Sequence, residues 1–156
     1  ASCYVLVSME HKLKEGSLQD RTVDLVDELL YDAISCSASD IHIQPDAMGL
    51  RVRFRIDGIL YDQKPVENVC SSQVISRIKV LSQLDVSERR LPQDGKFRLQ
   101  IASHNNIINN DGARFFIDVR VSTFPSIHGE KVVVRILLPI ISIESKFFQL
   151  SLCRTR

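Results

Sequence analysis

Apolar residues recur every three or four positions in two segments of the chain, and this spacing is typical of amphipathic helices. The first segment covers residues 23–34, follows a polar start suited to a helix N-terminus, and ends near Cys36. The second covers residues 74–84, with Ser71 or Ser72 available as its N-terminal cap. The pattern therefore predicts two helices.

Elsewhere apolar and polar residues alternate, as they do in strands with one buried face. The clearest case is residues 51–56, where three arginines alternate with three apolar residues before Asp57 and Gly58, a pair typical of a tight hairpin turn. Further strands are expected at residues 40–44, where Pro45 ends the run, and at 59–61, 97–101, 115–121 and 131–138. Residues 91–95 are interpreted as a turn, and the asparagine-rich residues 103–113 as an exposed loop.

Two helices and about five or six strands, mostly joined by short turns, predict an α+β domain with a mainly antiparallel sheet and the helices packed on one face. The 156 residues suit one domain with its own core. The formal charge of +1 argues against a generically basic nucleic-acid-binding protein. No run of about 18 apolar residues occurs, so no membrane-spanning helix is expected.

Arginines provide the candidate chemistry of the strands. Arg51, Arg53 and Arg55 share one strand face, which is compatible with phosphate binding but also with a solvated face paired with carboxylates. Because the net charge is near zero, we favour the solvated face and expect no nucleic-acid partner.

Arg120 and Arg135 occupy polar positions between apolar neighbours in the last two expected strands. If those strands pair, both guanidinium groups can project from the same face of the sheet. Such planar, permanently charged groups bind phosphate or carboxylate oxygens in pairs. A structural ion pair with Asp118 or Glu130 explains them equally well, so both interpretations stay open.

The chain contains neither the phosphate-binding pattern G-x-x-x-x-G-K-[ST] nor G-x-G-x-x-G, so it is not expected to hydrolyse ATP by itself. Its four histidines lack the spacing of metal ligands, and no metal site is expected. Its four cysteines are widely separated and are expected to be free thiols.

Six sequence blocks occur in an order that is far more specific than any one of them: SDIHIQP at 39–45, RFRIDG at 53–58, SRIKV at 76–80, RLPQDG at 90–95, DVRVST at 118–123 and HGEKVVVR at 128–135. Together they resemble the second N-terminal domain of the secretion ATPase superfamily, in particular type II secretion protein E and the type IV pilus assembly ATPases. The resemblance covers residues 23–138.

This resemblance implies a PAS-like module joined to a RecA-like domain that carries the Walker motifs, with six copies forming a ring. ATP and Mg would be bound only in the full-length parent, between the two domains. Arg120 and Arg135 match the positions that face the phosphates. Lys96 is a weaker candidate, because relatives often have Arg there and Lys lacks the planar fork. The chain would be cytoplasmic and peripheral to the inner membrane, which it would reach through platform proteins.

The expected organisation is a lead-in or linker over residues 1–20, the N-terminal domain of a secretion ATPase over 21–138, and an atypical tail over 139–156. Residues 103–113 look longer than the usual hairpin and are interpreted as an insertion. The leading hypothesis is a regulatory domain that closes on ATP and lends arginines to it. The alternative is a stand-alone PAS-like interaction module that binds a membrane-platform protein. The sequence leaves open protein secretion, pilus extension and DNA uptake.

Overall fold

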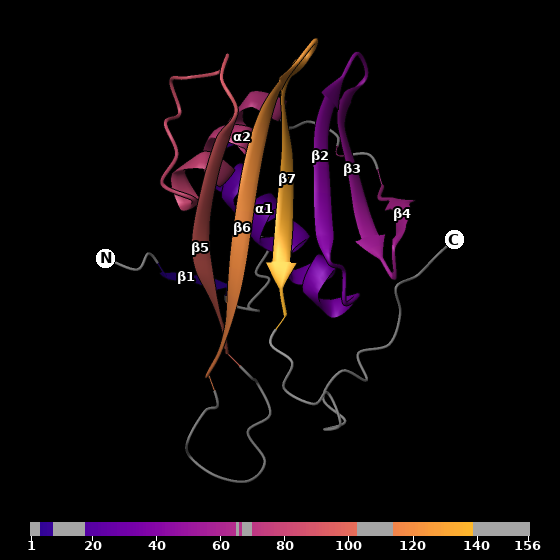
Figure 1. Cartoon of the computed structure of the whole chain (residues 1–156), viewed down its shortest axis with the longest axis vertical. Helices are drawn as coiled ribbons and strands as arrows, with labels where there is room; N and C mark the ends of the chain where they lie inside the picture. Colours follow the sequence, from indigo (N-terminus) through magenta and orange to yellow (C-terminus); the bar gives the residue numbers. More distant parts are fainter. Residues whose placement is uncertain (1–3, 8–17, 65, 67–69, 103–113, 139–156) are drawn as a thin grey trace, which may run out of the picture.

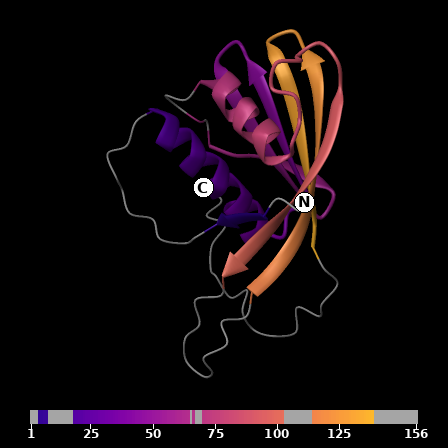
Figure 2. The same ribbon diagram turned by 90° about the vertical axis from the view of Figure 1, so that its left-hand side faces the viewer.

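Within the described residues, seven strands form one sheet and two helices pack against one of its faces (Figures 1 and 2). The computed structural model describes residues 4–7, 18–64, 66, 70–102 and 114–138. The helices are α1 (Leu18–Ser35) and α2 (Ser71–Leu81). The strands are β1 (Tyr4–Val7), β2 (Asp40–Asp46), β3 (Gly49–Ile56), β4 (Ile59–Asp62), β5 (Gln93–Ala102), β6 (Arg114–Ser126) and β7 (Gly129–Leu137).

The strands lie in the order β1-β5-β6-β7-β2-β3-β4, and every neighbouring pair is antiparallel except β1 and β5. The predicted α+β class, the two helices and the mainly antiparallel sheet are therefore confirmed. β1 is an additional strand within the expected lead-in, and its pairing with β5 joins segments about ninety residues apart. A four-residue apolar run carries too little local pattern to predict such a pairing.

The expected turn at residues 91–95 is partly wrong, because β5 already begins at Gln93. Gly95 occupies this strand because the backbone comes close to the chain that follows α2. A Cβ atom at Gly95 would lie 2.5 Å from the carbonyl oxygen of Ser82 and 2.8 Å from Cδ2 of Leu84. The glycine thus marks a close approach of backbone and not a turn.

Several expectations concern residues that the structure does not describe. The insertion at 103–113 and the tail at 139–156 lie outside the described residues.

Of the cysteines, Cys70 is a free thiol, as expected, whereas Cys36 is disulfide-bonded, so the expectation of a free thiol is wrong there. Neither helix in the described ranges has the length and hydropathy needed to cross a membrane.

The core lies between the two helices and the inner face of the sheet. Figure 2 shows both helices on this side of the sheet. On α1 the apolar stripe read from the sequence is buried, and on the central strands every second residue is buried. Apart from Val74 of α2, the largest fully buried apolar side chains come from the sheet: Phe54, Ile41, Ile43, Leu99, Val52, Val119, Val121, Val132 and Val134. This alternation leaves the polar residues of the same strands on the opposite, open face.

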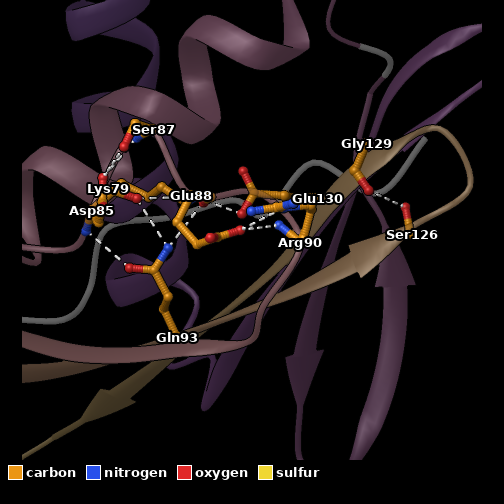
Figure 3. Close-up of polar contacts among 9 residues, drawn as sticks. All are labelled: Lys79, Asp85, Ser87, Glu88, Arg90, Gln93, Ser126, Gly129 and Glu130. Atoms are coloured by element: carbon orange, nitrogen blue, oxygen red, sulfur yellow. Dashed lines mark hydrogen bonds and ion pairs between the residues drawn. The ribbon is translucent and has the colours of Figure 1, made fainter.

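A buried ion pair crosses this core and joins α2 to the hairpin of β6 and β7. Lys79 is 0% exposed and Glu130 is 6% exposed, and the Lys79 Nζ to Glu130 Oε1 distance is 2.5 Å. The same ammonium group donates to the carbonyl oxygens of Glu88, at 2.6 Å, and Asp85, at 3.4 Å (Figure 3). These acceptors compensate the lysine charge inside the protein.

Gln93, the first residue of β5, holds the same loop from the other side. Its Nε2 donates to the carbonyl oxygens of Asp85, at 3.0 Å, and Glu88, at 3.1 Å, while its Oε1 accepts from the backbone N–H of Asp85 at 2.9 Å (Figure 3). The residues between α2 and β5 are therefore anchored to both elements.

Replacing Lys79 by Met should lower the free energy of unfolding by about 3–5 kcal/mol, because Glu130 would be left buried without its counter-charge. The double variant Lys79→Met/Glu130→Leu should recover at least half of that loss, since Gln93 still occupies the loop carbonyls. Urea unfolding followed by circular dichroism measures both. Lys64→Met, at an exposed lysine, is the control and should change stability by less than about 0.5 kcal/mol. A Lys79→Met variant as stable as this control would contradict the role of the ion pair.

Candidate functional site

Five charged side chains form a row across the open face of the sheet, on five adjacent strands. The strand register places Lys96 opposite Arg120 and Arg120 opposite Arg135. It continues from Arg135 to Asp40 on β2, and from Asp40 to Arg55 on β3. Directly opposed residues in antiparallel strands have Cβ atoms about 4.5–5.5 Å apart, so each member of the row is adjacent to the next.

The cationic end of this row borders a hollow of about 580 Å³ in the open face. Lys96, Arg120 and Arg135 are all exposed there. The other lining residues are Asp94, Gly95, Val121, Ser122, Phe124 and Val133. The prediction that Arg120 and Arg135 project from one face of paired strands is thus confirmed, and Lys96 joins them.

Lys96 and Arg120 form no hydrogen bond or ion pair with another residue in the described part of the chain. Like charges in directly opposed positions destabilise a sheet. Two unneutralised cations side by side therefore cost the fold stability, and such a cluster is typical of a surface that meets an anion.

Asp40 holds the third cation. Arg135 Nε donates to Asp40 Oδ1 at 3.0 Å, and Ser39 Oγ donates to Asp40 Oδ2 at 2.9 Å. Arg55 Nε lies 3.7 Å from the same Oδ2. Burial alone would raise the pKa of Asp40, but the hydrogen bonds from Arg135 and Ser39 outweigh burial and hold the pKa below its usual range.

The interpretation of Arg120 and Arg135 as members of ion pairs with Asp118 or Glu130 is wrong in both partners, although Arg135 does form an ion pair, with Asp40. Asp118 accepts from Arg98 Nε at 2.7 Å, and Glu130 pairs with the buried Lys79. Asp40 lies 95 positions before Arg135 in the chain, and only the pairing of β2 with β7 brings them together. The sequence motif at 39–45 contains Asp40 and so points to this residue, but it does not indicate that Arg135 is its partner.

The arginines of β3 agree with the solvated face favoured from the sequence at two of three positions. Arg51 forms a two-pronged ion pair with Asp62, at 2.8 and 3.0 Å, and Arg55 contacts Asp40 and the carbonyl oxygen of Gly58. Arg53 differs, because its Nε is buried without a hydrogen-bond partner in the described part.

His42 lies opposite Arg53 in the register, between the motif residues Asp40 and Gln44. Burial first, and then the positive charges of Lys131 and Arg55, lower the pKa of His42. The imidazole is therefore neutral near pH 7, and it adds no charge to the row.

Other binding modes find little support in the described residues. No three His, Cys, Asp or Glu side chains gather there as a group able to hold a metal ion. The cavity between the helices and the inner face of the sheet measures about 10 Å³, enough for one water molecule at most. A smaller hollow, of about 230 Å³, has Arg89 and His128 in its lining. The open face, with its hollow of about 580 Å³ and its cluster of cations, is the candidate site.

Fold and site together define an α+β domain whose open sheet face carries a cluster of cations around a hollow. A profile of the type II/IV secretion system protein family matches residues 17–152. The chain belongs to this family, and the match confirms the resemblance carried by the six motif blocks. It extends beyond Leu138, where that resemblance ends.

Curated relatives agree with this assignment. The chain is 44% identical over 115 residues to the type II secretion system ATPase E of Vibrio cholerae, covering 74% of this chain and 21% of that protein. It is 42% identical over 115 residues to the type IV pilus assembly ATPase PilB of Myxococcus xanthus, covering 74% of this chain and 19% of that protein. The chain thus spans about a fifth of the length of these relatives.

Among solved structures, the chain is similar to the ATPase DotB of Yersinia pseudotuberculosis, at 16% identity and a TM-score of 0.47, covering 73% of this chain and 29% of that one. This similarity is too low to support a conclusion about the present chain.

The lowered pKa of Asp40 predicts how stability changes with pH. A carboxyl group with a lowered folded-state pKa stabilises the protein above its unfolded pKa, and this contribution is lost as pH falls through the folded-state pKa. Wild type should therefore be more stable than Asp40→Asn by a constant amount above about pH 5, and the difference should shrink below about pH 4. Urea unfolding of both proteins across this range measures it. A difference that stays constant or grows on acidification would contradict the ion pair.

Proposed function

We propose that this chain is the N-terminal regulatory domain of a type II secretion or type IV pilus assembly ATPase, which closes on ATP held by a separate RecA-like domain. The observation that carries the proposal is the row of Lys96, Arg120 and Arg135 around the hollow, with two of its cations unneutralised. The family assignment and the ATPase names of the relatives support it.

The three cations suit a triphosphate in number and placement. ATP would supply a chain of phosphate groups with several negative charges, and Mg would be bound together with it in the full-length parent. Arg120 and Arg135 would each direct guanidinium N–H groups at phosphate oxygens. These donors would stabilise the negative charge that spreads over the phosphoryl group during its transfer. Lys96 would add a point charge without the directed pair of donors.

The cations would contact the phosphates only after this domain has closed on the RecA-like domain. The open face brings its cations to the phosphates only when the two domains meet, so the positions of the domains and the hydrolysis of ATP become coupled. By itself the chain would bind phosphate weakly and would not hydrolyse ATP, because it has no phosphate-binding loop.

The setting of the proposal follows from the family resemblance. The RecA-like domain would belong to the same polypeptide, neighbouring subunits would complete a hexamer, and platform proteins would connect this cytoplasmic motor to the inner membrane. Protein transport or pilus assembly would be the process that the parent protein drives.

Arg120→Ala and Arg135→Ala in the parent protein, which contains this chain and the RecA-like domain, should each lower kcat for ATP hydrolysis by about 100-fold or more. The reason is the loss of a cation that acts on the phosphates in the transition state. Steady-state hydrolysis assays measure the effect, and the isolated chain serves as a blank.

The matched control is Arg51→Ala, which removes an arginine from the same face of the sheet but from an exposed ion pair with Asp62, away from the hollow. It should leave kcat within about twofold. Unchanged hydrolysis in both the Arg120 and Arg135 variants would rule out the arginine role.

The alternative, an interaction module for a membrane-platform protein, draws on one feature of the hairpin tips. Met48, at 95% exposed, and Ile127, at 97% exposed, lie on the β2–β3 and β6–β7 turns, which stand at the same end of the sheet in Figure 1. Exposed apolar side chains at one end of a domain suit a protein contact.

This alternative predicts that the chain binds a platform protein without nucleotide, and that Met48→Ser/Ile127→Ser weakens binding about tenfold or more. Calorimetric titration of the purified platform protein measures it. Binding that needs ATP, or that the double variant leaves unchanged, would contradict the alternative.

A further inference from the structure

Arg120 and Arg135 are neighbours in the register, yet they are restrained very differently. Arg135 donates through Nε to Asp40, whereas Arg120 makes no hydrogen bond or ion pair with the residues the structure describes. Both side chains line the same hollow. The difference between them therefore comes from Asp40 alone.

Asp40 binds Arg135 in a way that leaves the two terminal nitrogens of the guanidinium group available. Its carboxylate takes the Nε–H, and the two terminal nitrogens of the guanidinium form no hydrogen bond to other described residues. The side chain of Arg135 remains 65% exposed while that of Asp40 is 9% exposed. A buried carboxylate thus holds the inner edge of the guanidinium, and the outer edge stays open to the hollow.

Asp40 is itself well fixed. It opens β2, which lies between β7 and β3 near the middle of the sheet. Its second oxygen accepts from Ser39 Oγ and lies near Arg55, so the carboxylate is held on more than one side. A group fixed in this way transmits its position to whatever it binds.

We propose that Asp40 is a positioning residue for the phosphate-facing role of Arg135. It holds the guanidinium group so that the two terminal nitrogens are already oriented when a phosphate group arrives. This inference rests on the proposed function of the open face. Arg135 would then bind with little further loss of side-chain freedom, while Arg120 becomes ordered only when the anion arrives.

The effect of removing the Asp40 charge separates positioning from simple electrostatics. If Asp40 acted only as a nearby negative charge, neutralising it would strengthen the binding of an anion. If it positions Arg135, neutralising it weakens binding, because the guanidinium must be ordered at the moment of contact. The two accounts predict opposite signs.

The test is a titration of the chain with inorganic tripolyphosphate at low ionic strength, followed by NMR of the arginine Nε–H groups. Asp40→Asn should weaken binding by about three- to tenfold, the cost of ordering one long side chain. The matched control is Asp118→Asn, which removes a carboxylate that accepts from Arg98 Nε on the same face of the sheet but does not line the hollow. It should leave binding unchanged or strengthen it.

Two further backgrounds show that Asp40 acts through Arg135. In Arg135→Ala the additional change Asp40→Asn should no longer weaken binding, whereas in Arg120→Ala it should weaken binding by its full factor. Equal effects of Asp40→Asn in both backgrounds would overturn the inference.

A measurement on the wild-type chain guards against a variant that fails to fold. Without ligand, ¹⁵N relaxation should show the Nε–H of Arg135 ordered and that of Arg120 mobile, and tripolyphosphate should order both. Equal mobility of the two groups in the free chain would overturn the inference.

The outcomes distinguish this inference from the proposed function. If Arg120→Ala and Arg135→Ala weaken tripolyphosphate binding but Asp40→Asn strengthens it, positioning fails while the phosphate-facing role stands. If the chain binds no tripolyphosphate, or if neither arginine variant weakens binding, the phosphate-facing role fails and the inference fails with it.

Discussion

The buried ion pair between Lys79 and Glu130 is the constraint on which the arrangement of this domain depends. An ammonium group inside an apolar core needs its counter-charge and its carbonyl acceptors at the same time, and these come from β7 and from the loop after α2. The contacts that the Lys79 ammonium group requires therefore fix α2, the loop after it and the β6–β7 hairpin relative to one another. Because Gln93 binds the same loop, the start of β5 is held as well, and with it the edge of the hollow.

The two faces of the sheet treat charge in opposite ways. On the helix side, the charge of Lys79 is buried together with the carboxylate of Glu130 and two backbone carbonyl oxygens. On the open side, Lys96 and Arg120 stand next to one another without a counter-ion among the described residues, at a cost to stability. Asp40 combines features of both faces, because its own side chain is buried while the arginine that it binds, Arg135, is exposed. The buried side of the domain thereby supports an open face on which cations gather.

Much of this site could be predicted from local pattern. Strict alternation in the last two strands placed Arg120 and Arg135 on one face, because side-chain direction in a strand follows from parity alone. The partner of Arg135 could not be predicted in this way. Asp118 and Glu130 are close in sequence and were the natural candidates, but strand order, which depends on long-range pairing, selects Asp40. Gly95 was misread for a related reason, since its neighbour Ser82 approaches from another element.

Short-range periodicity and motifs were enough to predict the α+β class, both helices, the faces of most strands, the family and the pair of arginines. The strand order β1-β5-β6-β7-β2-β3-β4, the row that joins Lys96 to Arg55, and the ion pairs of Asp40 and Lys79 became known from the folded structure. The physical reason is that these contacts join residues tens of positions apart, whose meeting depends on how the whole chain buries its apolar surface.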